Sequence, residues 1–167
     1  MPSSKVSVKI MAEPILGAQC DIRRATVSDL FACPEITELL QEYADQSSNT
    51  ELPPANPQQE IYMRMEEAGF FHVIAAFRGR ELIGFAAVVV AVLPHYGVPV
   101  ATMESIFVRN RHRHYGAGIK LVREAENLAR EQGAKGLLVT APAGGRLSLV
   151  MPKIGYRKTN TVFFRVL

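Results

Sequence analysis

Apolar residues recur along the first part of the chain with two different spacings. Residues 20–25 alternate between apolar and polar, which predicts a strand. Thr26 can cap the first turn of a following helix with its hydroxyl, and Pro34 should break or kink that helix. The helix is expected to continue to about residue 43, because apolar residues recur at helical spacing: Leu30, Ile36, Leu39, Leu40 and Tyr43.

The middle of the chain combines short apolar strands with one long amphipathic helix. A polar, proline-rich loop over residues 45–58 leads to a second helix over residues 59–68. Gly116 to Gln132 then has one apolar face and predicts a helix that Gly133 ends. Three apolar runs bounded by turn residues predict a meander of strands between the second and third helices, over residues 71–77, 82–93 and 100–109.

After the long helix, residues 136–141 read as a buried strand, residues 146–150 as a short helix and residues 156–167 as one or two strands. This order mixes hairpins with crossover helices, so we expect a single α/β domain over residues 20–167, with a mixed sheet that has helices on its faces. Residues 1–19 lack a sustained period and are expected to form a partly ordered arm, in which residues 6–10 alternate enough for a short edge strand.

Composition excludes several classes of protein. The net charge of +3 does not by itself argue for nucleic acid. Cys20 and Cys33 have neither zinc spacing nor the density of a disulfide framework, so we expect reduced thiols in a cytoplasmic protein. The four histidines show no metal spacing with acidic or thiol partners, and no metal is expected. Lys5 and Lys9 interrupt any signal-peptide core, and the apolar run over residues 85–93 is too short to cross a membrane.

A basic turn lies between the last strand of the meander and the long helix. It ends in an R-x-x-G-x-G sequence that begins at Arg113 and contains Gly116 and Gly118. The first turn of a helix has N–H groups without partners and partial positive charge from the macrodipole, so it attracts phosphate, and glycine lets the backbone come close. A basic run is ordinarily a solvated turn, but its position here favours a phosphate-bearing ligand; the run is Arg109, Arg111, His112, Arg113 and His114.

The segment from Ile106 to Gly118 resembles the acetyl-coenzyme A motif of the GCN5-related N-acetyltransferase (GNAT) family, an apolar strand followed by (R/Q)-x-x-G-x-(G/A). The order of elements strengthens the resemblance, because dinucleotide folds place their glycines after a first strand, whereas here they follow a meander. The resemblance covers residues 20–167 and is strongest over residues 100–141. It implies a mixed, mostly antiparallel sheet flanked by helices and splayed between its fourth and fifth strands.

The resemblance also implies how acetyl-CoA binds. The pantetheine arm would lie along Ile106, Phe107 and Val108. The Ile106 amide would polarise the thioester carbonyl, because a fixed N–H stabilises the charge that grows on that oxygen in the transition state. The diphosphate would be surrounded by the residues of the glycine turn: Arg113, His114, Tyr115, Gly116, Ala117, Gly118 and Ile119.

Glu104 is the first candidate for the base that accepts the proton of the attacking amine. It stands in an otherwise apolar strand, two residues before Ile106, so strand alternation predicts that both face the same side. The alternative is a carboxylate that pairs with one of the nearby arginines. Both interpretations stay open at this point.

The leaving thiolate lacks the acid that the family commonly supplies. That acid is a tyrosine four residues before a Gly-Phe or Gly-Tyr pair; Gly155 and Tyr156 form such a pair, but Met151 stands at the tyrosine position. Ser148, Tyr156 or water could substitute. A coenzyme A thiol has a pKa near about 8.5, so its thiolate can leave without strong acid assistance.

The sequence therefore predicts an acetyl-CoA-dependent N-acetyltransferase in which a primary amine attacks directly in a ternary complex. Transfer of another acyl group, a non-catalytic acyl-CoA-binding regulatory module and nucleic-acid binding through residues 109–113 are the alternatives. The acceptor is a small-molecule or protein amine, and a cationic one is weakly indicated by Glu42, Asp45, Glu51 and Glu60. The apolar run Val162 to Phe164 allows a homodimer.

Overall fold

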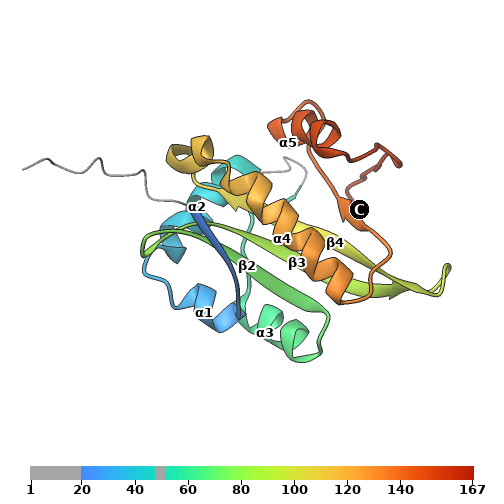
Figure 1. Ribbon diagram of the computed structural model, residues 1–167, viewed down its shortest axis with the longest axis horizontal. Helices are drawn as coiled ribbons and strands as arrows, with labels where there is room; N and C mark the ends of the chain where they lie inside the picture. Colours follow the sequence, from blue (N-terminus) through green and yellow to red (C-terminus); the bar gives the residue numbers. More distant parts are fainter. Residues whose placement is uncertain (1–19, 48–51) are drawn as a thin grey trace, which may run out of the picture.

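The computed structural model describes residues 20–47 and 52–167, which form a five-stranded sheet with helices on both faces (Figure 1). The predicted arm over residues 1–19, with its short edge strand over residues 6–10, lies outside the described residues, as does part of the predicted loop. The elements in chain order are β1 Cys20–Ala25, α1 Val27–Phe31, α2 Ile36–Ser47, α3 Gln59–Glu67, β2 Phe71–Arg78, β3 Glu81–Leu93, β4 Val98–Val108, the 3₁₀ helix η1 Asn110–Tyr115, α4 Ala117–Glu131, β5 Leu137–Val139, α5 Arg146–Val150 and the 3₁₀ helix η2 Met151–Ile154.

The first predicted helix is divided into α1 and α2, and Pro34 lies between them. Pro34 has no N–H for a helical hydrogen bond, and its ring excludes a straight helix through this point. The predicted cap is confirmed: the Asp29 N–H donates to the Thr26 hydroxyl at 3.0 Å, and the Thr26 N–H donates to the Asp29 carboxylate at 3.1 Å. These two reciprocal bonds form a capping box. Helix α2 runs beyond the predicted end, to Ser47.

Strands β1 to β4 form an antiparallel meander, and β5 joins the edge of β4 in parallel. The β4–β5 pairing covers only Ala101–Met103 against Leu137–Val139. Strand β4 continues to Val108 without a partner on that side among the described residues. The predicted divergence of the fourth and fifth strands is therefore confirmed, and it leaves backbone groups of β4 open.

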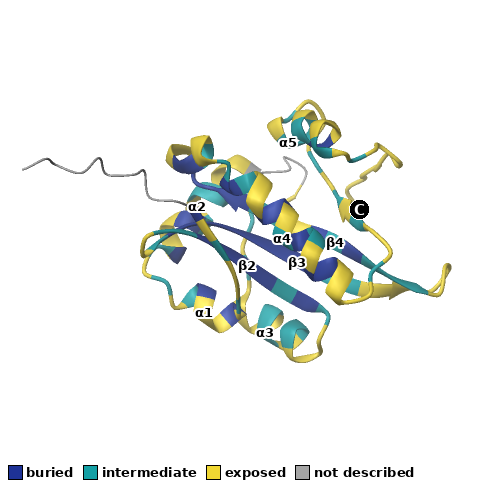
Figure 2. Cartoon of the chain, viewed as in Figure 1, coloured by how far each residue is buried: buried dark blue, intermediate teal, exposed yellow. Residues whose placement is uncertain are grey.

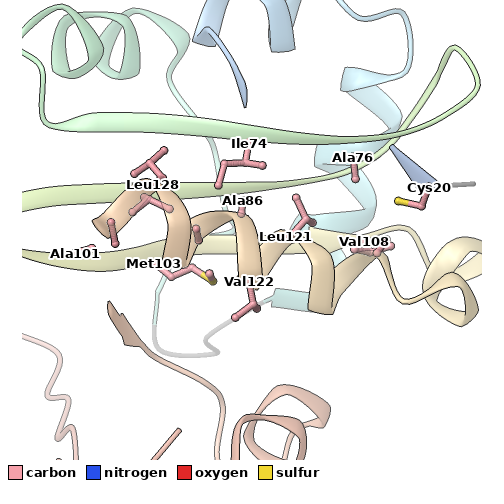
Figure 3. Close-up of a cluster of buried hydrophobic side chains, with 14 of the residues drawn as sticks. Cys20, Ile74, Ala76, Ala86, Ala101, Met103, Val108, Leu121, Val122 and Leu128 are labelled. Atoms are coloured by element: carbon pink, nitrogen blue, oxygen red, sulfur yellow. The ribbon is translucent and has the colours of Figure 1, made fainter. Parts of the chain in front are cut away.

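The sheet is buried on both faces. Helix α4 covers one face through the cluster drawn in Figure 3, in which Leu121 and Leu128 pack against Ile74 and Ala86. Helices α1, α2 and α3 cover the other face, where Leu39 packs with apolar side chains of β2, β3 and β4. The middle strands are consequently buried along most of their length (Figure 2). No helix in the described part of the chain is long and apolar enough to cross a membrane.

The strands predicted over residues 156–167 are wrong, because this segment has no regular secondary structure. Alternation alone does not make a strand, since its N–H and C=O groups need a neighbouring strand to bond with. Figure 2 shows it as an irregular, mostly exposed segment beyond α5. Most of its large apolar side chains are exposed: Val162, Phe163, Phe164, Val166 and Leu167.

Candidate active site

The glycine turn lies at the start of α4. The 3₁₀ helix η1 precedes it, where the sequence predicted a basic turn. Gly116 has φ +70°, a left-handed conformation that favours glycine. The Lys120 N–H donates to the Gly116 carbonyl at 3.1 Å, and no side chain caps this helix start. The N–H groups of Ala117, Gly118 and Ile119 precede that bond and lie at the positive end of a 15-residue helix. This geometry suits an anion.

The space around these amides is open. A Cβ atom added to Gly118 would have no heavy atom within 4 Å. Tyr115 and Ile119 are 44% and 45% exposed, and His114 is also exposed. The Arg78 guanidinium lies over the Tyr115 ring, 4.4 Å from its centroid. The chain thus places the predicted residues from His114 to Ile119 around one exposed helix start.

Arg113 is held between this turn and the end of β4. Its Nε donates to the Val108 carbonyl at 2.8 Å, and its Nη2 donates to the Gln46 side chain at 2.6 Å. Burial, followed by the positive charge of Arg146, lowers the pKa of the Arg113 guanidinium. Two cations from η1 and α5 therefore lie near one another. Sequence reasoning missed Arg146; its position directly after Gly144 and Gly145 was the available signal.

The other two arginines of the basic run form ion pairs with carboxylates of the protein. Arg109 is only 6% exposed and pairs with Glu38 at 3.0 Å and Glu42 at 3.2 Å, while Arg111 pairs with Glu81. Although burial opposes it, the Asn110 N–H, which donates at 2.8 Å, and then Arg109 hold the pKa of Glu42 below its usual value. Glu42 is thus already engaged in contacts within the protein.

A β-bulge determines what the open edge of β4 presents. The register passes from Ala87 opposite Ser105 to Val88 opposite Met103, so Glu104 is an extra residue without a partner on β3. The Arg109 N–H donates to a carbonyl of β3 at 2.9 Å. Because backbone groups alternate in direction along a strand, those of Val108 and Ile106 face the other edge. The bond from Arg113 to the Val108 carbonyl agrees with this direction.

The bulge also changes the direction of the Glu104 side chain. We expected Glu104 on the same face of the sheet as Ile106. Ile106 packs with the α4 cluster, whereas the charge of Glu104 affects Tyr62, which belongs to the cluster on the opposite face. Burial, followed by the negative charge of Glu104 and then Tyr43, raises the pKa of Tyr62 to about 12. Arginine pairing is not found either, since no cation of the described residues lies within 4.0 Å of the Glu104 carboxylate.

An apolar cavity of about 30 Å³ lies beside the bulge, between α1, α2, α3 and strands β2 to β4. The Tyr62 ring stacks on Phe71 with centroids 4.7 Å apart, and Tyr43 packs edge-on against Phe85 at 5.6 Å. Sequence reasoning missed this cavity because its walls come from segments far apart in the chain. The lining residues are Val27, Leu30, Phe31, Leu40, Tyr43, Pro57, Tyr62, Phe71, Val73, Phe85, Ala87 and Ser105.

The candidate acids for a leaving thiolate are engaged in other contacts. Met151 is buried in the core. The Tyr156 hydroxyl donates to Glu126 of α4 at 3.1 Å, and burial, followed by the charge of Glu126, raises the pKa of Tyr156. The Ser148 hydroxyl donates to the Gly145 carbonyl at 2.7 Å. In the described part of the chain, no group of three or more His, Cys, Asp or Glu side chains is placed to hold a metal ion.

Solved structures share this fold at low sequence identity. An aminoglycoside acetyltransferase from an uncultured soil metagenomic sample, in complex with sisomicin, is 18% identical with a TM-score of 0.69 over 89% of this chain and 96% of that one. A ribosomal-protein-alanine N-acetyltransferase from Brucella melitensis biovar Abortus 2308 is 17% identical (TM-score 0.67; 89% and 99%). A transcriptional regulator from Bacillus halodurans C-125 is 20% identical (TM-score 0.70; 89% and 100%).

Comparison of the sequence with models of protein families identifies the family of this chain. A search of curated proteins returns no match. The family model described as Acetyltransferase (GNAT) family matches residues 33–146, a range that contains the bulged strand, the glycine turn and α4. The chain therefore belongs to the GNAT acetyltransferase family.

Proposed function

We propose that this protein is an acetyl-CoA-dependent N-acetyltransferase in which a primary amine attacks the thioester directly in a ternary complex. The observation that carries the proposal is the continuity of two open backbone surfaces. The unpaired edge of β4 ends at Val108, and the exposed amides at the start of α4 follow through η1. A ligand with an amide-containing arm and a diphosphate matches both surfaces.

The residues present fit such a ligand. Backbone groups at the open edge, above all those of Ile106, would take the pantetheine arm beside Phe107 and Val108. The space at Gly118 admits a diphosphate close to the helix amides. Arg113 and Arg146 supply positive charge at the same end of β4.

Acetyl-CoA, when bound, would supply the acetyl thioester, and the chain's own groups would stabilise the charge and accept the proton. The Ile106 N–H is the proposed donor to the carbonyl oxygen, where negative charge grows as the C–N bond forms. Glu104 is the proposed base that accepts the proton lost by the amine. The C–S bond then breaks, and water protonates the thiolate, because Tyr156 and Ser148 are engaged elsewhere.

Replacement of Glu104 by Gln tests the base. We expect kcat to fall by about 100-fold or more, the usual contribution of a general base, with an unchanged Kd for coenzyme A. The assay is release of free thiol with a broad panel of amines. Glu67→Gln, a matched change at an exposed position of α3, should leave both quantities unchanged. An unchanged kcat in Glu104→Gln would remove Glu104 as the base.

The non-catalytic regulatory module remains the alternative, and Met151 at the usual tyrosine position is the observation that favours it. Coenzyme A binding without turnover on any amine would select this alternative. The internal pairing of Arg109 and Arg111 argues against a nucleic-acid surface. Duplex binding that weakens steeply with salt would contradict that conclusion.

We also propose a cytoplasmic homodimer. Both cysteines are free thiols, which agrees with a reducing compartment. The exposed apolar segment from Val162 to Leu167 would be covered by a second copy of the chain. Light scattering should give a dimer mass for the unmodified protein and a monomer mass for Phe163→Asp; a monomer mass for both would contradict the proposal.

A further inference from the structure

We propose that the acceptor is a primary amine with a short, unbranched apolar substituent, which occupies the cavity while the amino group stands at Glu104. This inference rests on the proposed transferase function and adds a substrate class to it. The cavity adjoins the bulge directly, because Ser105 lines its wall and Glu104 is the preceding residue. An apolar group placed there would leave its amine at the edge of β4.

The walls of the cavity select against a polar substituent. Apart from the Ser105 hydroxyl and the two tyrosine hydroxyls of Tyr43 and Tyr62, every lining side chain is apolar. A hydroxyl or a second ammonium group entering it would lose its hydration without a full set of hydrogen-bond partners. An alkyl group loses nothing polar there and gains contact with aromatic rings.

The charges around the site match an acceptor with one positive charge. Glu104 has no ion pair within the described residues and is therefore available to an ammonium group. The neighbouring acids on α2 have partners: Glu38 and Glu42 pair with Arg109, and Asp45 accepts from the Gln41 side chain at 2.9 Å. Glu66 of α3 accepts the Val27 N–H at 3.0 Å. A polyamine or an aminoglycoside in the cavity would place its remaining positive charges against apolar walls.

The size of the cavity sets the length of the substituent. One water needs about 10–15 Å³ by the same measure, so about 30 Å³ holds two or three such spheres. This corresponds to a chain of about two to four carbons. Each buried methylene should raise kcat/KM by about fourfold, and the increase should stop once the cavity is full.

The experiment measures kcat/KM along the series methylamine to hexylamine, whose members differ little in basicity. We expect a rise of about fourfold per methylene up to propylamine or butylamine and no further gain beyond. Spermidine, kanamycin and a lysine-containing peptide should lie at least tenfold below butylamine. A second readout is the Kd of methylamine and of butylamine for the protein saturated with coenzyme A, measured by calorimetry, where the same increments are expected.

Three variants assign the effect to the cavity. Ala87→Val adds two methyl groups to the wall and should shorten the productive series, whereas Val73→Ala enlarges the cavity and should lengthen it. Ala91→Val, at an exposed position of the same strand as Ala87, should leave the series unchanged. The melting temperature and the coenzyme A affinity show whether either cavity variant has lost its fold. If one has, the other variant alone tests whether the cavity sets the length of the substituent.

The two levels of the proposal fail in different ways. A flat alkylamine series, or a preference for spermidine or the lysine peptide, overturns the substrate class while turnover itself supports the transferase. Coenzyme A binding with no turnover on any amine overturns the transferase. In that case methylene increments in the binding readout still support an apolar amine site, and their absence overturns it.

Discussion

Replacing Gly118 by Ala separates the stability of α4 from its role toward a ligand. Gly118 lies in the first turn of α4, and its φ is not in the left-handed range. A Cβ atom at this position would meet no heavy atom within 4 Å. The protein itself therefore tolerates the methyl group, and only a molecule that approaches the helix start would meet it.

Gly118→Ala should raise the stability of the fold and lower the affinity for coenzyme A. Alanine is favoured over glycine in a helix by up to about 1 kcal/mol, so the variant should be more stable by about 0.5–1 kcal/mol. For a domain of this size, that gain raises Tm by about 1–4 °C. Loss of one charge-assisted hydrogen bond to a phosphate costs about 1.5–3 kcal/mol, which raises the Kd for coenzyme A by roughly 10-fold to 100-fold.

Thermal unfolding followed by circular dichroism measures the first quantity, and calorimetric titration with coenzyme A measures the second. Gly136→Ala is the matched control, since a Cβ atom added to Gly136 would also meet open space and its φ is not left-handed, but this residue lies beside β5, away from the glycine turn. Its coenzyme A affinity should not change. A lower Tm for Gly118→Ala would refute the open packing around this residue, and an unchanged Kd would refute the diphosphate site.

Three further outcomes follow from packing and charge. Gly84→Ala should destabilise the protein by about 2 kcal/mol or more in urea unfolding, because its Cβ would lie 2.5 Å from a backbone oxygen of β4; a change below about 0.5 kcal/mol would contradict this. Because the fold raises the pKa of Tyr62 from 10.0 to about 12, the folded protein keeps a proton that the unfolded chain loses, so this stabilisation is complete below pH 10 and is lost as pH rises toward 12. Tyr62→Phe should show a smaller loss of stability over that range, and an identical loss would argue against the shift. Glu42→Ala should cost about 2–3 kcal/mol because Arg109 is buried, whereas Glu38→Ala, at a side chain that is 75% exposed, should cost less than about 1 kcal/mol; equal costs would count against this network.

Local signals in the sequence were sufficient for most elements. The hydroxyl of Thr26 and the missing N–H of Pro34 act on their immediate neighbours, so both effects were predictable. The bulge at Glu104 was not, because alternation assumes one residue per pleat and a single extra residue reverses every direction after it. The expected strands over residues 156–167 failed because a strand depends on a partner elsewhere.

The candidate site also contains both features that are local in the sequence and features that only the fold brings together. The glycine turn is contiguous in the chain, so its place at a helix start was predictable from the residues, and the role of His114 to Ile119 toward a diphosphate stays a prediction. The cavity combines residues from Val27 to Ser105, and no local pattern connects them. Arg146 likewise reaches the vicinity of Arg113 only through the fold.

The extra residue in β4 is an insertion that the strand absorbs at one point, because pairing with β3 continues on both sides of it. Before it, Met103 packs with the α4 cluster, and after it Ile106 does so. Between them, Ser105 lines the cavity and the charge of Glu104 acts on Tyr62. Deleting Glu104 would restore regular alternation, so Met103 and Ile106 would still pack toward α4 and only the extra side chain would be lost. The bulge therefore adds one acidic side chain to the strand without moving the flanking residues that pack under α4.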